Sequence, residues 1–146
     1  MSRELIGARV ATLYELQSAW LEPRLRDIGV RWTSFQFLAA IVGAGEEASQ
    51  AEVARRLGLS PATLSETVQN HINIGWIEQT KSERDKRLKV LRLTNDGKKL
   101  MMKIRALVVE CETLVANSVS IPESKKCAKA LDKMIDALEN ALQEQG

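Results

Sequence analysis

Apolar residues recur at spacings of three and four along most of the chain, which is the period of one face of an α-helix. This pattern predicts a first helix over residues 4–28, with Gly29 as its stop. Pro23 lies inside it, and because proline has no backbone N–H to donate, we expect a kink or a new turn there. Apolar stripes also predict two long helices near the end of the chain, one capped by Thr94 and one after a break at residues 121–123.

Capping residues predict shorter helices between these long ones. Thr33 and Gln36 form a T-x-x-Q box, and Ser49 and Glu52 form a similar box further along the chain. In such a box each side chain satisfies a free backbone N–H group near the helix start. We therefore expect one helix to begin at Thr33 and another at Ser49.

A tight turn separates two of the short helices. The helix that begins at Ser49 is closed by Gly58, and the next helix runs to about Gly75. Gly58 can adopt a left-handed conformation, Ser60 can cap the following helix, and Pro61 suits its first position. This arrangement predicts a helix-turn-helix.

The apolar period then changes to two. Short strand-like segments at residues 76–81 and 88–93 flank a charged loop at residues 82–87. Leu91 and Leu93 alternate with the residues between them, so we expect a half-buried two-stranded hairpin with a charged tip.

The composition fits an ordinary globular protein, with 45% hydrophobic and 27% charged residues in a chain of 146. Two cysteines make no disulfide framework, and no apolar stretch approaches the roughly 20 residues that span a bilayer. Charged residues interrupt the start of the chain, so we expect no secretory signal. These features predict a cytoplasmic protein with reduced thiols and no membrane partner.

Motifs of enzymes and metal sites do not occur in the sequence. It has no glycine-rich phosphate loop, no nucleophile motif and no histidine paired with a carboxylate at a telling spacing. One histidine and two separated cysteines do not readily assemble a four-ligand metal site. We therefore expect a protein that is not an enzyme and that holds no cofactor and no metal.

Positive charge is concentrated in one part of the chain. The formal net charge is only +2, but residues 51–94 carry eight Lys and Arg against five Asp and Glu. The excess is densest within residues 82–92, at the hairpin loop. A local basic cluster is a candidate phosphate-contacting surface, and a solvated loop is the alternative.

A helix-turn-helix followed by a basic hairpin suggests DNA binding. The second helix of such a motif enters the major groove and turns its N-terminal residues toward base edges. The candidate contacts on this helix are Ser60, Pro61, Ala62, Thr63, Ser65, Gln69 and Asn70. At the hairpin tip, Arg84, Lys86 and Arg87 are candidates for the neighbouring backbone or the minor groove. The same helix pattern also occurs in small helical proteins that bind no DNA.

These residues resemble a known family. The segments are Leu57-Gly58-Leu59-Ser60, Gly75-Trp76-Ile77, Asp85-Lys86-Arg87 and Leu93-Thr94-Asn95-Asp96-Gly97. They are similar to the winged-helix signature of the multiple-antibiotic-resistance regulator (MarR) family, most specifically in D-x-R followed after five residues by L-T-x-x-G. The resemblance implies a mainly α fold, a winged helix-turn-helix with a two-stranded β wing, flanked by N- and C-terminal dimerisation helices.

The resemblance also implies a division of the chain and two residue roles. Residues 30–94 would form the DNA-binding lobe, and residues 1–29 and 95–146 the dimerisation helices of one single MarR-like chain, residues 1–146. Arg87 would be the wing arginine that reaches a minor groove, and Asp85 the residue that orients it. An Asp–Arg pair that only clasps the wing is the alternative.

The sequence departs from the family pattern on the recognition helix. Between Ser60 and Gly75 the only formal charge is Glu66, at a position where the family usually has a basic residue. Phosphate attraction would then fall to Arg55, Arg56 and the wing. A winged-helix module that binds protein, with weak or no specific DNA binding, is therefore the alternative function.

Family members commonly release DNA when a small anionic aromatic compound binds. We expect such an effector site to be lined by Tyr14, Trp20, Arg24, Trp32 and Phe35. The alternative is that these residues simply fill the core. His71 is expected at the edge of the core, Cys111 within it, and Cys127 without a redox role.

Together these observations predict a sequence-specific regulator of transcription that binds double-stranded DNA. We expect a repressor that binds a pseudo-palindromic operator as a homodimer, with release by a small aromatic or anionic ligand as a further hypothesis.

Overall fold

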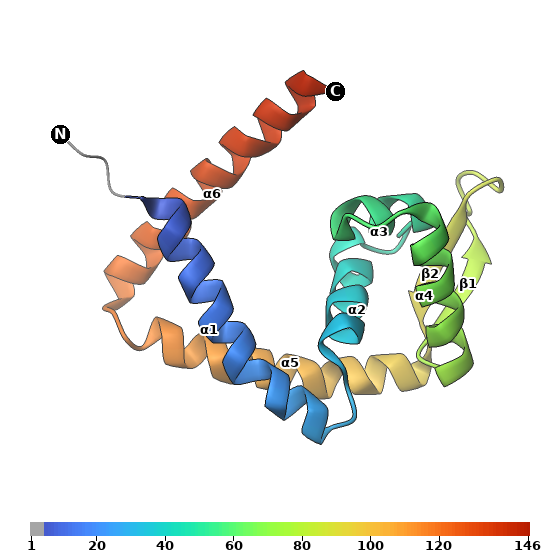
Figure 1. The fold of residues 1–146 in the computed structure, drawn as a ribbon, viewed down its shortest axis with the longest axis horizontal. Coiled ribbons are helices and arrows are strands. Elements are labelled where there is room, and N and C mark those ends of the chain that lie inside the picture. The colour runs from blue at the N-terminus through green and yellow to red at the C-terminus, as the bar shows by residue number, and fades with distance from the viewer. Residues whose placement is uncertain (1–4) are drawn as a thin grey trace. The chain divides into compact units, whose positions relative to one another are not determined.

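The computed structural model describes residues 5–146, which form six helices and one two-stranded antiparallel sheet. In chain order the elements are α1 (Ile6–Asp27), α2 (Trp32–Ala44), α3 (Gln50–Leu57), α4 (Pro61–Ile74), β1 (Ile77–Lys81), β2 (Lys89–Leu93), α5 (Asn95–Ala116) and α6 (Ile121–Gln145) (Figure 1). The expected mainly α fold with a β wing is confirmed. The chain divides into two compact units, Met1–Val108 and Val109–Gly146, and the boundary falls within α5.

The first helix continues through its proline. α1 runs unbroken through Pro23, so no new helix begins there. The backbone of Gly29, at a φ of 80°, ends the helical segment as expected. The predicted start of this helix at residue 4 lies outside the described residues.

The capping box predicted at Thr33 is wrong. The residue that precedes α2 is Arg31, whose backbone is extended, and no side chain caps this helix end. Thr33 therefore lies inside the first turn, where its side chain cannot act as the N-cap. Gln36 instead points toward Tyr14, with 3.5 Å between its Nε2 and the phenolic oxygen.

One of the two hydrogen bonds of the capping box predicted at Ser49 is confirmed. The Ser49 hydroxyl accepts a hydrogen bond from the backbone N–H of Glu52 at 3.1 Å. The carboxylate of Glu52 does not return to Ser49, because it pairs with Arg55 and Arg56 one turn further along α3.

The turn between α3 and α4 is confirmed. Gly58 has a φ of 64°, in the left-handed region that a side chain disfavours. Two residues later, Ser60 accepts a hydrogen bond from the N–H of Thr63 at 3.2 Å, and Pro61 occupies the first turn of α4. Local chemistry therefore fixes where α4 begins.

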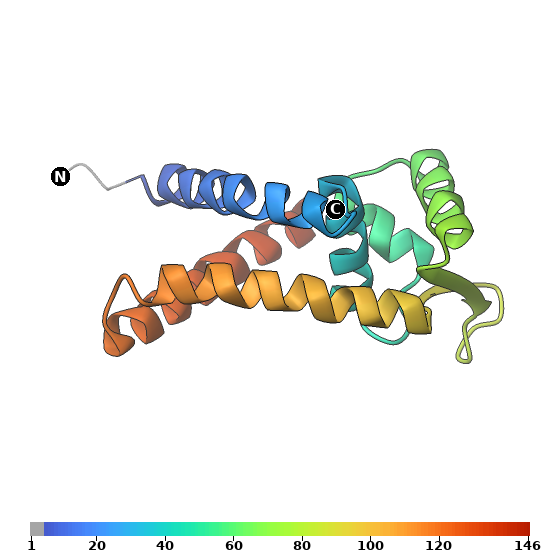
Figure 2. The same ribbon diagram turned by 90° about the horizontal axis from the view of Figure 1, so that it is seen from below.

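The hairpin pairs Ile77 with Leu93 and Lys81 with Lys89, and in both ribbon views its loop protrudes beyond α3 and α4 (Figures 1 and 2). The predicted alternation along β2 is wrong, because Val90 and Leu91 are both buried. A third segment explains this, since Val90 bridges to Ser49 and the N–H of Leu91 donates to the carbonyl of Ala48 at 2.9 Å.

The start of α5 contacts the two residues that precede β1. Thr94 accepts a hydrogen bond from the N–H of Gly97 at 3.0 Å, as a cap should, and donates its own hydroxyl to the carbonyl of Gly75. A Cβ atom on Gly97 would lie 2.0 Å from the carbonyl oxygen of Trp76. The glycine of the L-T-x-x-G motif is therefore required by a close backbone approach.

The core of the first unit is built from all of its elements. Its largest fully buried side chains are Leu25, Val30, Phe37, Leu38, Val53, Leu64, Ile77, Val90, Leu91 and Ile104. This core holds α3, α4 and the hairpin as one frame, so the side chains that they expose have defined positions.

The second unit contains the end of α5 and the whole of α6. α6 begins with a full capping box, in which Ser120 and Glu123 satisfy each other's backbone N–H groups. None of its described residues is buried. Within the described residues, no helix is long and apolar enough to cross a membrane.

Candidate nucleic-acid interface

α4 buries one face and exposes the residues predicted to contact DNA. Leu64, Val68 and His71 face the core. Every predicted contact on this helix is exposed: Ser60, Pro61, Ala62, Thr63, Ser65, Gln69 and Asn70. Apart from Glu66, this exposed face carries no formal charge.

Several of these polar groups already have partners on the protein. The hydroxyl of Ser60 donates to that of Thr63 at 2.9 Å, at the start of the helix. Gln69 donates from Nε2 to Oδ1 of Asn73 at 3.0 Å, one turn toward the C-terminus. These contacts restrict the side chains before any ligand is bound.

A second set of contacts joins three different elements. Gln79 of β1 donates to Gln50 at the start of α3 at 2.7 Å, and Gln50 donates to Ser65 of α4 at 2.9 Å. The two glutamines were not predicted as site residues. No local sequence pattern indicates that they make contact, because Gln79 and Gln50 are 29 positions apart.

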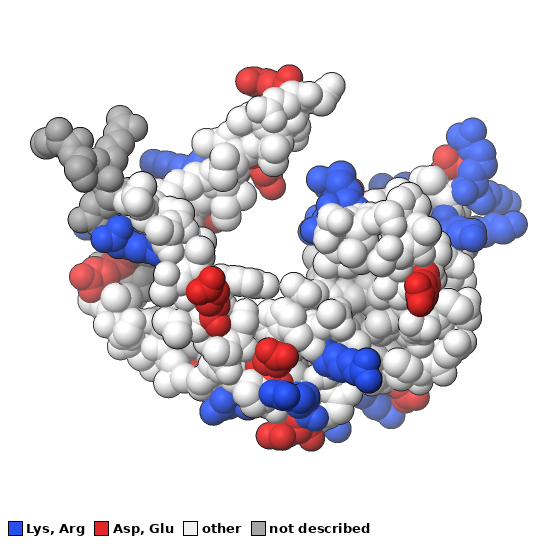
Figure 3. All heavy atoms as spheres, viewed as in Figure 1, with Lys and Arg blue, Asp and Glu red and all other residues white. Residues whose placement is uncertain are grey.

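The wing carries its positive charge at the tip. Figure 3 shows Lys and Arg side chains gathered at the end of the hairpin. The exposed cations of this region are Lys81, Arg84, Lys86, Arg87 and Lys89. They protrude from the first unit, which is the geometry needed to reach a polyanion beside α4.

Arg87 is held by Asp85. Its Nε and Nη2 donate to the two carboxylate oxygens of Asp85 at 3.1 and 3.2 Å, while its side chain stays 90% exposed. The side-chain and backbone hydrogen bonds from Arg87 hold the pKa of Asp85 below its usual value. Asp85 is therefore ionised at neutral pH and restricts the direction of the guanidinium group.

The base of the wing loop is tied to the loop before α3. Ser82 is buried, and its hydroxyl donates to Oε2 of Glu47 at 2.7 Å. The hydroxyl oxygen of Ser82 also accepts hydrogen bonds from the backbone N–H groups of Arg84 and Asp85, at 3.1 and 3.2 Å. Sequence reasoning missed this contact, which fixes where the basic tip projects.

The cations of α3 are engaged with an acid. Arg55 and Arg56 both donate to Glu52, at 2.7 and 3.1 Å. These side-chain hydrogen bonds, that of Arg55 first, hold the pKa of Glu52 below its usual value. Part of the charge expected to attract phosphates from α3 is thus compensated inside the protein.

Part of this chain is similar in sequence to known proteins. A sequence model of the MarR family matches residues 28–88, from the start of the α2 region through the wing loop. The HTH-type transcriptional regulator BilQ of Clostridium symbiosum (strain WAL-14163) is 28% identical over 98 residues, which is 67% of this chain and 68% of that protein. Residues 28–88 of this chain are therefore similar to the MarR family.

Solved structures share the MarR-family fold. A MarR transcriptional regulator from Methanosarcina mazei has a TM-score of 0.74 at 21% identity, covering 97% of this chain and 99% of that one. MepR of S. aureus, in a structure of its complex with DNA, has a TM-score of 0.73 at 18% identity, covering 92% and 99%. At these identities the likeness establishes the fold, and the contacts of this chain must be argued from its own residues.

The five residues predicted to line an effector pocket form two contact sets. The ring of Trp32 lies 6.5 Å from that of Tyr14 and 5.0 Å from that of Phe35, centroid to centroid. Separately, the guanidinium of Arg24 stacks over Trp20 at 3.7 Å. Their role in ligand binding stays a prediction.

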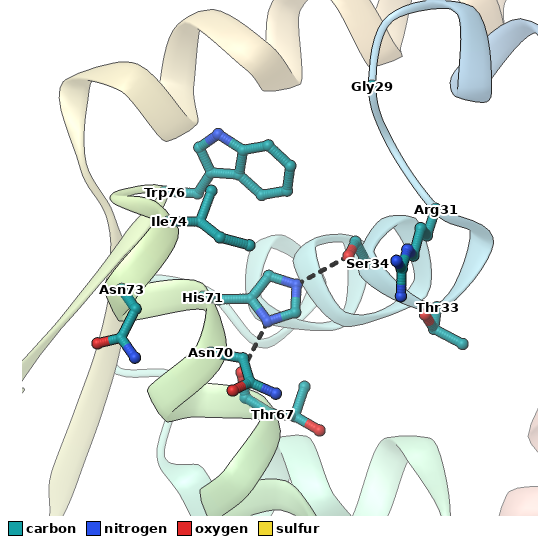
Figure 4. Close-up of a pocket in the computed structure, with 10 residues that line it drawn as sticks. All are labelled: Gly29, Arg31, Thr33, Ser34, Thr67, Asn70, His71, Asn73, Ile74 and Trp76. Carbon is teal, nitrogen blue, oxygen red and sulfur yellow. Dashed lines mark hydrogen bonds between the residues drawn. The ribbon is translucent and has the colours of Figure 1, made fainter.

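A cavity of about 530 Å³ lies elsewhere in the first unit of the chain (Figure 4). It is lined by Gly29, Arg31, Thr33, Ser34, Thr67, Asn70, His71, Asn73, Ile74 and Trp76. Only Arg31 among them carries a formal charge at neutral pH. Sequence reasoning did not place this cavity, whose lining comes from two segments far apart in the chain.

His71 lies in the core, as expected. Its Nδ1 is 2.7 Å from the carbonyl oxygen of Thr67, and its Nε2 is 3.0 Å from the hydroxyl of Ser34 (Figure 4). Its ring also packs 4.6 Å from that of Phe37. The buried histidine thus has a buried hydroxyl among its hydrogen-bond partners.

The two cysteines differ in their surroundings. Cys111 is buried and Cys127 is exposed. Over residues 5–146, no group of three or more His, Cys, Asp or Glu side chains is arranged to hold a metal ion.

Proposed function

We propose that this protein is a MarR-family transcriptional repressor that binds double-stranded DNA as a homodimer. The observation that carries the proposal is the pairing of an exposed neutral face on α4 with a protruding cationic hairpin in one unit. In helix-turn-helix proteins the second helix enters the major groove. A hairpin with cations at its tip suits the adjacent backbone or minor groove.

Base reading would rest on neutral groups of α4. Asn and Gln side chains pair with adenine, and the methyl groups of Ala or Thr contact the thymine methyl. Ala62, Thr63, Gln69 and Asn70 expose these groups. Because Gln69 already donates to Asn73, its carbonyl oxygen and second amide proton are the parts left for DNA.

Affinity for phosphates would come from outside α4. Arg84, Lys86 and Arg87 are exposed at the wing, whereas Arg55 and Arg56 are partly compensated by Glu52. We therefore expect the wing to supply most of the phosphate contacts of each subunit, and with them the salt dependence of binding. The MepR complex with DNA and the regulator BilQ support this assignment by family relationship.

Exposed apolar residues on two helices support a homodimer. In the first unit α1 exposes Ile6, Val10, Leu13 and Leu16. In the second unit α6 exposes Met134, Ile135, Leu138 and Leu142. Contiguous apolar surface of this kind usually marks an interface, and a second copy of the chain would bury it.

The homodimer has a direct test in α6. We expect Leu138→Glu to convert the dimer into monomers in sedimentation velocity, because it places a charge in the apolar stripe. Gln143→Glu adds the same charge at a polar position and should leave the dimer intact. A dimeric L138E protein would contradict this interface.

A two-fold dimer predicts a two-fold operator. The two recognition helices would read half-sites whose centres lie about 10 base pairs apart, or a multiple of one helical turn. Selection of bound duplexes from a random pool should enrich an inverted repeat with this spacing. Enrichment of no motif, with equal binding to all duplexes, would overturn sequence-specific DNA binding.

The neutral recognition helix also favours a second candidate, a protein-binding winged helix. Binding to DNA falls steeply with salt, whereas an apolar protein interface does not. If the selection fails and a captured protein partner binds with no salt dependence, the second candidate is correct.

We propose the cavity beside His71 as a candidate site for an effector. Its volume lies within the usual range for small-molecule sites. Arg31 supplies a positive charge, no acidic residue lines the cavity, and Trp76 offers an aromatic surface, so an anionic aromatic compound fits its chemistry. We expect benzoate to lower DNA affinity in the wild type and not in Arg31→Ala. Equal effects on both proteins would contradict this site.

A further inference from the structure

A row of hydrogen-bonded side chains links the wing strand to the recognition helix. Gln79 donates from Nε2 to Oε1 of Gln50, 2.7 Å away, and Gln50 donates from Nε2 to Oγ of Ser65, 2.9 Å away. We name these three residues the glutamine relay. It runs from two half-buried glutamines to an exposed serine on the face of α4 that the proposed function turns toward DNA.

The relay has a direction. An amide side chain has one accepting end and one donating end. Because Gln79 occupies the oxygen of Gln50, the nitrogen of Gln50 faces Ser65. The serine oxygen then accepts this hydrogen bond, so its own proton must point away from Gln50.

That proton is available to a ligand. Within the part of the chain that the structure describes, the Ser65 hydroxyl donates to no protein acceptor. Thr67 on the same helix behaves differently, because its hydroxyl donates back to the carbonyl of Thr63 at 3.0 Å. Ser65 therefore presents a directed O–H group on an exposed surface.

We propose that the glutamine relay makes Ser65 a hydrogen-bond donor that reads one acceptor-only base edge in the major groove, that of guanine or thymine. A freely rotating serine both donates and accepts, so it discriminates poorly. Guanine N7 and O6 and thymine O4 accept hydrogen bonds, whereas cytosine presents a donating N4 and adenine a donating N6 beside N7. A serine held as a donor favours the first two bases. This inference rests on the proposed function, because it requires α4 in the major groove.

A substitution at Gln79 should reverse the hydrogen-bonding role of Ser65, from a donor toward DNA to an acceptor. In Gln79→Glu the carboxylate can only accept, so the nitrogen of Gln50 must turn toward it. The oxygen of Gln50 then faces Ser65, which donates to Gln50 and presents only an acceptor to DNA. Residue 79 would thus control a base preference that it does not contact.

The test measures affinity by fluorescence anisotropy for the duplex selected by the wild type and for all its single base-pair substitutions. We expect the wild type to prefer guanine or thymine at one position of each half-site by roughly two- to ten-fold, the range of one neutral hydrogen bond. Ser65→Ala should abolish this preference. Gln79→Glu should weaken or reverse it at the same position only, and the double variant Q79E/S65A should show no preference there, as S65A alone does.

Asn73→Asp is the matched control for the added charge. It also lies on the exposed side of α4, and its side chain already accepts a hydrogen bond from Gln69, so aspartate keeps that contact. N73D should lower affinity for all duplexes alike and leave the preference unchanged. If Q79E folds normally yet keeps the wild-type preference, or changes affinity only as N73D does, the relay is wrong.

A measurement without DNA separates the relay from the proposed function. In nuclear magnetic resonance spectra of the free protein, S65A and Q79E should each shift the side-chain amide signals of Gln50, and N73D should not. Unshifted signals would overturn the relay itself. Shifted signals in a protein that selects no duplex would refute the reading of DNA and with it the proposed function.

Discussion

The guanidinium group of Arg87 lies against the carboxylate of Asp85, with Nε 3.1 Å from Oδ1 and Nη2 3.2 Å from Oδ2. Two residues separated by one position form this bidentate pair at the tip of the wing. An ion pair on such an exposed arginine contributes little to folding stability. Its main physical effect is to restrict the direction of Arg87, which matters for a group that must reach a narrow groove.

Arg87→Ala should therefore weaken binding to all duplexes without changing the preferred sequence. We expect the slope of log K against log salt concentration to fall by about 1, the loss expected for one phosphate contact. Lys129→Ala, which removes an exposed cation of α6, is the control and should leave the slope unchanged. An R87A protein with wild-type affinity and slope would exclude this role.

The pair also predicts how Asp85 titrates. Hydrogen bonds from Arg87 lower the pKa of Asp85 below its ordinary value of 3.8. The stabilisation from the pair is thus fully present above pH 3.8 and is lost as the pH falls through the lowered pKa of the folded state. In a pH titration by nuclear magnetic resonance, Arg87→Gln should raise the pKa of Asp85. An unchanged pKa would mean that the pair does not form in solution.

His71 and Ser34 should behave as one unit in the core. Because the carbonyl of Thr67 can only accept, Nδ1 of His71 carries the proton, and Nε2 accepts from Ser34. His71→Leu leaves the buried Ser34 hydroxyl without this partner, at a cost of about 1–2 kcal/mol in unfolding free energy. Adding Ser34→Ala should recover part of the loss in urea denaturation. A double variant less stable than H71L would contradict the pairing.

Gly97 should tolerate no side chain. A methyl group there would lie 2.0 Å from the carbonyl oxygen of Trp76, so the backbone of the wing or of α5 must move. We expect Gly97→Ala to lower the free energy of unfolding by at least about 2 kcal/mol. Gly7→Ala is the control, since no neighbouring atom approaches that position within 4 Å, and it should raise stability by up to about 1 kcal/mol. Equal stabilities for the two variants would refute the close approach.

The parts of the fold that the sequence predicts well depend on local chemistry. Gly58, Ser60 and Pro61 determine the turn of the helix-turn-helix through groups at most three residues apart, and the same holds for the cap at Thr94. Thr33 has the residue type of a cap but not the position, because the extended backbone belongs to Arg31. Ser120 is the opposite case, because Ser120 and Glu123 form a full capping box at the start of α6, where the sequence pattern predicts only a break in the chain.

The parts that could not be predicted depend on long-range contacts. Val90 and Leu91 are both buried because Ala48 and Ser49 pair with β2. Ser82 meets Glu47 across 35 positions, and the cavity beside His71 combines two separate segments. Such contacts follow from packing of the whole unit, so no spacing or motif in the sequence indicates them.

The most direct test of the account is the binding of the wild-type protein to the intergenic DNA upstream of its own gene and to a scrambled duplex, measured by fluorescence anisotropy across a salt series. We predict that the native duplex binds more tightly, with one dimer for each site and an affinity that falls steeply as salt rises. Equal weak binding to both duplexes, or no binding at any salt concentration, would contradict the assignment as a sequence-specific regulator.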